Sequence, residues 1–599
     1  MSTEAIQLRE LDGSQLYYSI LAGAQRIFEH QKILNKINVF PVADADTGTN
    51  LASTMRSIVD AKIPIENLKQ TAAAIADAAL SGARGNSGII FAQFLYGFSN
   101  ELKADGKLDV QSFAESMQKA VGYAYDAIAN PVEGTILTVI KDWADYLYAV
   151  KDIIDDFIRI LLEAYNKAVQ SLSETTKNLE VLTRSNVVDA GAKGFVYFLE
   201  GILDFFTKGY DTSSKAITAE EDQEFEVPDL HEEITFRFCT EAMIAGENLD
   251  KKAIQEKLHD LGDSIVAAGT PKKIRVHIHT DHPAEVFSQL TGFGAITYQK
   301  VDDMVMQQEI MHNRKSDIAI LTDSTCDLPQ ELLDHHQIHM MPLSVHFGDS
   351  FYLDRLSMNA PQFYQMQQQT DVRPTTSQPT VKDFQNKFEY LSTQYKSTLG
   401  FFVSDKLSGT YQNGLKSARD IGDRDGKPSY IYNSKSLSAG LGLVVLRVAR
   451  AVEEGMSLDE ILPKIDTWIA KSNIRVTIPT LNYIIKSGRI SPFKSFVART
   501  LDLKPVIEID KEGKAEIIGK SLSINGSHKK LINVIKNELK GEEIWEYAIT
   551  HAGNSEVADH YAVEMEKISG KKPIFMDHVS PVLVANTGPG VVAISFMLK

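Results

Sequence analysis

The sequence predicts a multidomain protein: an all-α domain, then a small α+β domain, then a C-terminal α/β domain. Its 599 residues exceed what one hydrophobic core usually serves. From about residue 317 apolar strands alternate with helical segments, which is typical of an α/β sheet. In the first 210 residues, apolar positions instead recur at helical spacing over 14–33, 68–80, 111–128, 152–180 and 194–207.

Composition narrows the class of protein. Hydrophobic residues make up 43% and charged residues 24%, which indicates a globular chain. The formal net charge of −17 argues against binding to nucleic acid or to an anionic membrane surface. The two cysteines, Cys239 and Cys326, fall in different predicted domains, and the N-terminus has no signal-peptide pattern. No apolar run reaches the roughly 18 residues of a membrane span, so we expect a cytoplasmic protein.

The all-α domain opens with a segment that suggests a metal site. In residues 38–50, NVFPVADADTGTN, an apolar run with a proline leads into a turn that carries Asp44 and Asp46. Carboxylates two residues apart can direct oxygens at one hard cation, and Mg²⁺ is typically held by one or two carboxylates and substrate phosphates. Ordinary turn chemistry, in which the aspartates bond their own backbone, is the alternative and stays open.

Three further loops in this domain are rich in small residues: 82–88 (GARGNSG), 131–138 (PVEGTILT) and 189–194 (DAGAKG). Glycines let backbone N–H groups converge on an anion at the start of a helix. Each loop alone is more simply a helix cap or a tight turn. Four such loops in one helical segment favour a phosphate-binding rim.

Together these motifs resemble the ATP-binding subunit of bacterial fatty acid kinases, within the DhaL-like group of helical barrels. The resemblance covers residues 1–210 and implies ATP and Mg²⁺ as cofactors, with Asp44 and Asp46 as the catalytic, Mg²⁺-binding pair. The wider group has a third aspartate upstream, where this chain and the fatty acid kinase branch have asparagine, here Asn38. The implied nucleotide-binding residues are Thr47, Thr49, Asn50, Gly85, Asn86, Ser87, Gly88, Thr135, Asp189 and Gly191.

An acidic, aperiodic linker is expected at 211–230, before a middle domain at 231–312. In that domain we expect strands at 234–239 and 273–280 and a helix near 250–261. Period-two geometry places His277 and His279 on one strand face, where a metal site with Cys239 and a plain polar face are both open interpretations. The segment is similar to the middle domain of the same kinase family, which implies a structural Zn²⁺ on these three residues.

The last domain, 316–599, carries hydroxyl-rich loops at 376–379 (TSQP), 407–412 (LSGTYQ) and 587–590 (TGPG). Ligands gather at the C-terminal ends of strands in such sheets, and no nucleophile has a base in sequence reach. The loops therefore predict a carboxylate-binding pocket of neutral donors. A near match to a phosphate loop at 513–521 has one residue too many.

A metal cluster at His335, His336 and His339 is less expected than a solvated turn before a strand at 340–345.

These loops, with TDST at 322–325, PLS at 342–344 and KSGRIS at 486–491, resemble the DegV family of fatty-acid-binding proteins. The resemblance implies that Thr376 and Ser408 hold the carboxylate of a fatty acid. A histidine usually precedes the TGPG loop, whereas this chain has Asn586, which can donate a hydrogen bond but carries no charge. The full implied substrate-binding set is Thr376, Ser377, Ser408, Gly409, Thr410 and Asn586.

Both resemblances together imply a fatty acid kinase in one chain, which converts ATP and a fatty acid to ADP and an acyl phosphate. The carboxyl group, with a pKa of about 4 to 5, needs no base because it is ionised at neutral pH. The expected partners are a fatty acid, an acyl-phosphate-using acyltransferase at the membrane and a second copy in a homodimer. A carrier or sensor of fatty acids and a glycerone-type kinase of small polyols remain as alternatives.

Overall fold

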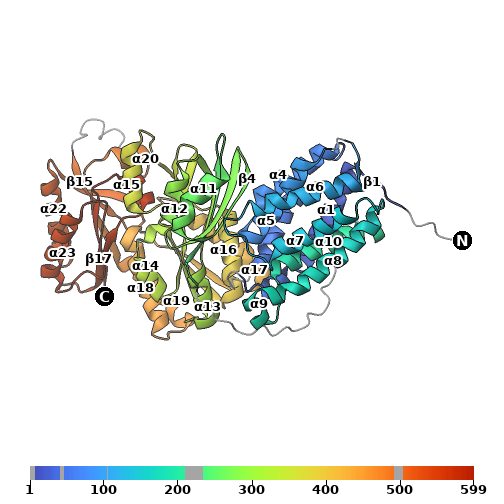
Figure 1. Cartoon of the computed structure of the whole chain (residues 1–599). Helices are drawn as coiled ribbons and strands as arrows, with labels where there is room; N and C mark the ends of the chain where they lie inside the picture. Colours follow the sequence, from blue (N-terminus) through green and yellow to red (C-terminus); the bar gives the residue numbers. More distant parts are fainter. Residues whose placement is uncertain (1–6, 41–45, 104–105, 209–233, 491–502) are drawn as a thin grey trace. The chain divides into compact units, whose positions relative to one another are not determined.

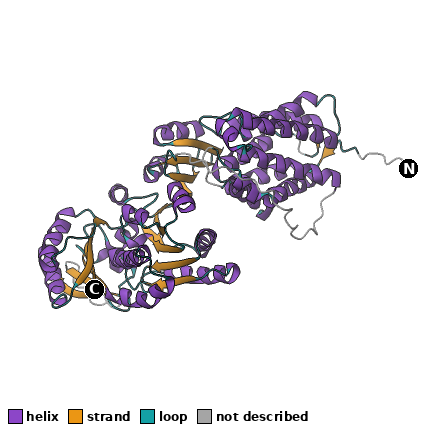
Figure 2. Cartoon of the chain, turned by 90° about the horizontal axis from the view of Figure 1, so that it is seen from below, coloured by secondary structure: helices purple, strands orange, loops and turns teal. Residues whose placement is uncertain are grey.

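The computed structural model describes residues 7–40, 46–103, 106–208, 234–490 and 503–599 (Figure 1). Asp44 and the expected linker at 211–230 lie outside the described residues. The chain divides into two compact units, one of residues 1–282 with 289–305 and one of 283–288 with 306–599. Figure 2 shows that the part of the chain next to the N-terminus is almost wholly helical, while sheets occur in the remainder.

The N-terminal region is a closed ring of helices. In order of contact the ring runs α1, α10, α8, α7, α6, α5, α4 and back to α1, with α3 packed against α1, α4, α5 and α10. The helices are α1 (Gly13–Glu29), α2 (Gln31–Lys36), α3 (Thr47–Asp60), α4 (Leu68–Gly82), α5 (Gly85–Glu101), α6 (Val110–Tyr125), α7 (Ile136–Val150), α8 (Phe157–Asn178), α9 (Glu180–Ser185) and α10 (Ala190–Lys208). A short antiparallel pair, β1 (Glu10–Leu11) with β2 (Leu108–Asp109), is the one departure from the all-α prediction among the described residues.

Local chemistry sets the helix starts, and aromatic side chains fill the ring. Asp12 forms a capping box at α1, which satisfies backbone N–H groups that the first turn leaves unpaired. Inside, Phe94, Trp143 and Phe195 are buried and meet edge to face, with centroids 5.7 to 6.4 Å apart. This is the favourable geometry for aromatic pairs.

The middle region is a four-stranded antiparallel sheet of order β4-β5-β3-β6. Its strands are β3 (Phe238–Ala245), β4 (Asp263–Thr270), β5 (Lys273–Thr280) and β6 (Ala295–Asp303), with helices α11 (Lys251–Leu258), α12 (Pro283–Leu290) and α13 (Met304–Asn313). The expected strand at 273–280 is confirmed, but the one at 234–239 is wrong in its bounds. Phe238 is the first residue to pair on both sides, with Thr280 and Asp303, so the strand begins there and continues to Ala245.

The C-terminal unit combines three sheets. A parallel sheet has the order β13-β12-β7-β8, a mixed six-stranded sheet has the order β16-β15-β14-β19-β17-β18, and a small antiparallel sheet has the order β10-β9-β11. The strands are β7 (Ile318–Asp323), β8 (Ile338–Met341), β9 (Ser344–Phe347), β10 (Ser350–Leu353), β11 (Thr375–Ser377), β12 (Ser397–Phe402), β13 (Ser429–Asn433), β14 (Ser472–Thr477), β15 (Lys504–Ile509), β16 (Ala515–Ser521), β17 (Ile544–His551), β18 (Met576–His578) and β19 (Val592–Leu598).

One buried helix joins the two large sheets of this unit. Helix α18 contacts β7 and β12 of the parallel sheet as well as β14, β17 and β19 of the mixed sheet. Its glycines, alanines and branched aliphatic residues are buried almost all round, which is typical of a helix enclosed in a core. The helices are α14 (Gln330–His335), α15 (Ala360–Gln369), α16 (Val381–Gln394), α17 (Thr410–Asp425), α18 (Ser438–Glu453), α19 (Leu458–Lys471), α20 (Asn482–Ser487), α22 (Ile524–Glu538), α23 (Ser555–Ser569) and α24 (Pro581–Thr587).

The structure tests two sequence predictions for this unit, the strand at 340–345 and the rejected phosphate loop at 513–521. The strand expected at 340–345 is wrong: β8 ends at Met341 and β9 begins at Ser344 because Pro342, which lacks an N–H, interrupts the ladder. The near phosphate loop is a hairpin, with Gly513 at φ +85° in the turn between β15 and β16, which agrees with its rejection.

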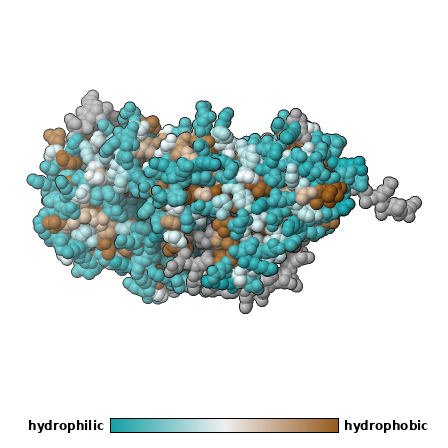
Figure 3. Space-filling view, in the orientation of Figure 1, coloured by the Kyte–Doolittle hydropathy of each residue, from teal (hydrophilic) through white to brown (hydrophobic). Residues whose placement is uncertain are grey.

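Surface hydropathy and helix length can be described for part of the chain. Apolar residues on the face in Figure 3 occur as small groups separated by hydrophilic ones. Within the described part of the chain, no helix has both the length and the apolar content to span a bilayer.

Candidate functional site

The small-residue loops of the helical ring meet at the starts of its helices. Glycines allow helix starts to approach one another: a Cβ atom on Gly85 would lie 2.2 Å from Asn50 Nδ2, and one on Gly191 would lie 2.6 Å from Ser87 Oγ. A Cβ atom on Gly88 would lie 2.7 Å from Thr54 Oγ1. The structure thus brings together the first turns of α3, α5 and α10, as a phosphate-binding rim requires.

Asp189 ties the start of α7 into the same group. Its carboxylate accepts hydrogen bonds from the backbone N–H groups of Ala192, at 2.7 Å, and of Ile136. Thr135 is the N-cap of α7, and its hydroxyl donates to Val132 O at 2.8 Å. Full burial raises the pKa of Asp189 to about 6. Four helix N-termini therefore lie near one another, and the Asp189 carboxylate links two of them, those of α7 and α10.

Two of the implied nucleotide-binding threonines have protein partners. The buried Thr47 hydroxyl donates to Asn38 Oδ1 at 2.9 Å, which gives the asparagine at this position a structural role. The exposed Thr49 hydroxyl accepts from Gln31 Nε2 and Asn35 Nδ2 on α2. Asn86 Oδ1, by contrast, is buried and has no hydrogen-bond partner among the described residues, so it is available to a ligand.

The middle sheet presents Cys239, His277 and His279 together; the spacing predicted the shared face of the two histidines, and the resemblance implied the addition of Cys239. One ligand atom of each lies within 4.8 Å of the others, and Cys239 Sγ is 3.8 Å from His277 Nδ1. A tetrahedral Zn²⁺ with ordinary bond lengths sets sulfur and nitrogen about 3.6 Å apart. His277 Nε2 is also buried without a hydrogen-bond partner among the described residues. These three residues therefore fit a zinc ion.

The metal-binding candidates of the ring and the sheet are electrostatic neighbours. Burial raises the pKa of the Cys239 thiol well above its ordinary value, and the negative charge of Asp46 adds to that shift. The same aspartate also favours the protonated forms of His279 and Lys300. The Asp46 carboxylate at the start of α3 is therefore close enough to the Cys239 cluster to act on its charge state.

Two further side chains on this sheet were not predicted from the sequence. Glu241 and Arg275 are almost fully buried, and Arg275 Nη2 donates to Glu241 Oε2 at 2.7 Å. Both lie two residues from a predicted ligand on the same strand face, Glu241 from Cys239 and Arg275 from His277. Their position on the strand face of the predicted metal ligands is the feature of the sequence that could have identified them.

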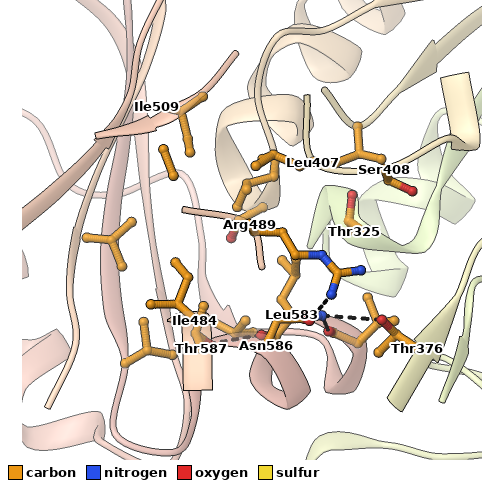
Figure 4. Close-up of a pocket in the computed structure, with 18 of the residues that line it drawn as sticks. Thr325, Thr376, Leu407, Ser408, Ile484, Arg489, Ile509, Leu583, Asn586 and Thr587 are labelled. Carbon is orange, nitrogen blue, oxygen red and sulfur yellow. Dashed lines mark hydrogen bonds between the residues drawn. The ribbon is translucent and has the colours of Figure 1, made fainter. Parts of the chain in front are cut away.

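In the C-terminal unit a cavity of about 440 Å³ lies between the elements that carry the hydroxyl-rich loops. This volume is in the range of ligand pockets. Most of the wall is aliphatic, and one end is polar (Figure 4). The aliphatic wall includes Leu407, Ile474, Val476, Ile478, Ile484, Ile507, Ile509, Leu583 and Val591. The polar end includes Thr325, Thr376, Ser377, Gln378, Ser408, Arg489 and Asn586.

Arg489 supplies the positive charge that Asn586 lacks. Its Nη1 donates to Asn586 Oδ1 at 3.0 Å, and Asn586 Nδ2 donates to Thr376 Oγ1 at 3.4 Å, so the three polar ends point toward one another (Figure 4). Burial, followed by the charge of Arg373, lowers the pKa of Arg489 from its ordinary value. A guanidinium still remains charged at neutral pH. Arg489 belongs to a family motif in the sequence, but its place in the site was not predicted.

The remaining expected substrate-binding residues support this end of the cavity. Ser408 and Gly409 line it directly at the start of α17, where a helix N-terminus favours an anion. Thr410 does not line the cavity: it is fully buried and shares a 2.8 Å hydroxyl hydrogen bond with Ser408. Ser377 Oγ lies 2.9 Å from His346 Nε2.

Of the three histidines rejected as a metal cluster, His335 and His336 lie together beside Glu453, with ligand atoms within 4.8 Å of one another, and His339 is not part of that group. His339 is buried and lies 3.1 Å from the Tyr395 hydroxyl. His335 and His336 instead face Glu453, at 3.2 and 3.4 Å.

Three family models match the chain in the order of these regions. The DAK2 domain model matches residues 41–204, the FakA-like middle-domain model of fatty acid kinases matches 235–311, and the model described as uncharacterised protein, DegV family, matches 317–599. A DAK2 domain, a FakA-like middle domain and a DegV domain thus occur in one chain. The all-helical, α+β and α/β fold classes are confirmed. The domain boundaries remain predictions.

Curated relatives match about half of the chain. An uncharacterized protein of Staphylococcus epidermidis is 32% identical over 323 residues, which is 52% of this chain and 58% of the relative. Protein YloV of Bacillus subtilis is 32% identical over 325 residues, which is 52% of this chain and 59% of YloV. The chain thus spans less than two thirds of the length of either relative.

Solved structures resemble the C-terminal part. A DegV family protein from Thermus thermophilus, described with fatty acid binding, is 25% identical and covers 47% of this chain and 99% of its own, with a TM-score of 0.43. DegV from Bacillus subtilis, described as a fatty acid binding protein, is 22% identical with the same coverage and a TM-score of 0.44.

Proposed function

We propose that this chain, with its DAK2, middle and DegV domains, is a fatty acid kinase that uses ATP and Mg²⁺ to convert a fatty acid to an acyl phosphate. The observation that carries the proposal is the pairing of two sites in one polypeptide. One is a group of helix N-termini suited to phosphates, and the other is an aliphatic cavity with a charged, hydrogen-bonding end. Neither site alone implies this reaction, because a phosphate-binding site requires a phosphoryl acceptor and a fatty-acid-binding cavity requires a phosphoryl donor.

The helical ring would bind the nucleotide. Gly88 and Gly191 let neighbouring helix starts pack closely against α5, Asn86 Oδ1 has no hydrogen-bond partner among the described residues, and Asp46 with Asp44 would hold the metal. When bound, Mg²⁺ neutralises charge on the transferred phosphoryl group and orients it. The helix N-termini add fixed positive potential at the same place.

The DegV domain would hold the fatty acid by both of its ends. The acyl chain would lie along the aliphatic wall, where each buried CH₂ contributes about 0.8 kcal/mol. The carboxylate would accept hydrogen bonds from Thr376, Ser408 and Arg489 at the polar end. Arg489 would also offset the repulsion between the anionic acceptor and the anionic phosphate.

The transfer step then needs no protein base. A carboxylate oxygen of the fatty acid forms a bond to the γ-phosphorus while the bond to the β,γ-bridging oxygen breaks, and ADP leaves. The residues contribute position and charge, which is the usual basis of catalysis for phosphoryl transfer. The two sites would have to approach each other within one chain or between two copies.

Zinc would have a structural role in this protein. Cys239, His277 and His279 would hold it, and their burial suits a closed site rather than one that exchanges ligands with solvent. We expect about one zinc per chain by metal analysis after purification without added metal, and loss of it in Cys239→Ser. A variant of the buried Cys326 to serine should keep the metal.

The proposal is tested by separating the two halves of the reaction. Acyl phosphate is trapped as hydroxamate, while binding of Mg·ATP and of oleate is measured separately. Asp46→Asn should abolish hydroxamate and weaken Mg·ATP binding alone, whereas Ser408→Ala should lower hydroxamate and weaken oleate binding alone. Asp60→Asn, on the last residue of α3, serves as the matched control and should change none of the three.

Other outcomes identify the alternatives. Oleate binding with no ATP turnover would leave a carrier or sensor of fatty acids. Glycerone phosphorylation that does not respond to lipid would identify a polyol kinase.

A further inference from the structure

The start of α5 already holds an anion that belongs to the protein. The backbone N–H of Gly85, the first residue of the helix, donates to Glu241 Oε1 at 2.7 Å. Glu241 comes from the middle of β3 and has only 1% of its surface exposed. A carboxylate from the sheet therefore occupies the place where a helix N-terminus would otherwise meet a phosphate.

The second carboxylate oxygen of Glu241, Oε2, also has a close hydrogen-bond partner. Arg275 Nη2 donates to Oε2 at 2.7 Å, and the same guanidinium donates through Nη1 to Ser81 O near the C-terminal end of α4 at 3.3 Å. The guanidinium also stacks over the Tyr298 ring, 4.4 Å from its centroid. Glu241 and Arg275 together join the end of α4 and the start of α5 to one strand face.

The same carboxylate reaches the Cys239 cluster. His277 Nδ1 lies 3.8 Å from Glu241 Oε1, and β3 pairs Glu241 directly with His277 of β5 and with Lys300 of β6. Burial by itself would raise the pKa of Glu241, but the positive charges around it, Arg275 first, hold it well below its ordinary value. Glu241 thus contacts both the loop at 82–88 and the Cys239 cluster.

We propose that Glu241 is a positioning residue: it holds the first turn of α5 in the geometry that binds nucleotide and ties that turn to the Cys239–His277–His279 cluster. The inference rests on the proposed nucleotide site. Because Glu241 occupies the Gly85 N–H, we infer that the phosphate contacts of this loop come from the residues that follow. A competing interpretation is that Glu241 imitates a phosphate and must leave before ATP binds.

The two interpretations predict opposite changes in affinity, so the test compares Glu241→Gln with wild type. A glutamine keeps a neutral oxygen near Gly85 but loses the ion pair with Arg275. Binding of the non-hydrolysable probe AMP-PNP with Mg²⁺ is measured by calorimetry, and backbone amide exchange of a peptide spanning 83–90 by mass spectrometry. Glu247→Gln, on the exposed turn after β3, is the matched control.

For a positioning residue we expect the Kd for Mg·AMP-PNP to rise about tenfold or more, and exchange in the 83–90 peptide to accelerate by a similar factor. A peptide at the start of α10 should exchange as in wild type. Unchanged or tighter binding in Glu241→Gln would overturn the proposal, as would unchanged exchange at 83–90.

Two provisions keep the test decisive. If Glu241→Gln does not fold, Glu241→Gln with Arg275→Gln removes both buried charges, and the same two results are expected of it. If the wild-type protein binds no Mg·AMP-PNP, the proposed nucleotide site is wrong. Amide exchange of residues 83–90 in Glu241→Gln then still decides whether Glu241 holds this turn.

Discussion

Replacing Arg489 by methionine tests the charged end of the lipid cavity most sharply. The change removes a guanidinium that lies in the cavity wall and donates to Asn586 at 3.0 Å, while it keeps a side chain of similar length. A hydrogen bond to a charged group contributes about 1.5–3 kcal/mol when its partner is desolvated. We therefore expect the Kd for oleate to rise by about 10- to 150-fold.

The assay compares oleate with oleyl alcohol, which carries the same chain and no charge. Displacement of a fluorescent fatty acid gives both affinities for wild type, Arg489→Met and Arg489→Lys. The loss in Arg489→Met should be confined to oleate, and lysine should restore part of it because a charge returns without the fixed guanidinium geometry. Arg419→Met, on the exposed face of α17, is the control.

Two results would refute this reasoning. Equal losses for oleate and oleyl alcohol would mean that Arg489 shapes the cavity rather than binds a carboxylate. Unchanged oleate affinity would mean that the neutral donors, Thr376 and Ser408 among them, are sufficient.

Three further predictions concern the ring and the buried acids. Burial raises the pKa of Asp354 to about 7, above its unfolded value, so its contribution to stability is full below about pH 4 and is lost as pH rises through 7. Urea unfolding from pH 4.5 to 7.5 should show a decline in the free energy of unfolding to which Asp354 contributes about 3 kcal/mol, and Asp354→Asn should remove that part. A decline of equal size in that variant would count against the assignment. Gly191→Val should raise the Kd for Mg·ATP, measured by calorimetry, about tenfold or more, because the added side chain would collide with Ser87 Oγ and displace the start of α10. An unchanged affinity would show that this turn is not part of the nucleotide site. Trp143→Ala should lower the free energy of unfolding of the helical ring by about 3–5 kcal/mol in denaturant titrations, whereas a loss below 1 kcal/mol would show that the ring does not depend on its aromatic core.

The sequence allowed prediction wherever the controlling interaction is local. Helical periodicity in the first 210 residues gave α1, α4, α6, α8 and α10, because each buries one apolar stripe against the same core. Period two placed His277 and His279 on one face, since alternation is a property of the strand itself.

Strand bounds and side-chain partners depended on distant segments. The start of β3 could not be derived because the alternation continues on both sides of Phe238, and only pairing with β5 and β6 decides where the strand begins. Thr49, expected near the nucleotide, turns to α2 because Asn35 and Gln31 happen to lie within hydrogen-bond reach.

The charged groups that fix both sites were the hardest to foresee. Glu241 on β3 meets Gly85 on α5, and Arg489 meets Asn586 on α24; in each pair the partner lies on an element far away in the chain. No spacing rule links such residues, so they become visible only once the fold brings them together. Arg489 does lie in the KSGRIS motif, and Glu241 lies two residues after Cys239.

The most direct test of a self-contained fatty acid kinase is the stoichiometry of the reaction that the purified 599-residue chain carries out with oleate, ATP and Mg²⁺ and no second protein. Hydroxamate formed after trapping is compared with ADP released. We predict oleate-dependent turnover with one hydroxamate for each ADP, and none of either with oleyl alcohol. Bound oleate without ADP release, or ADP release that oleate does not stimulate, would contradict the account.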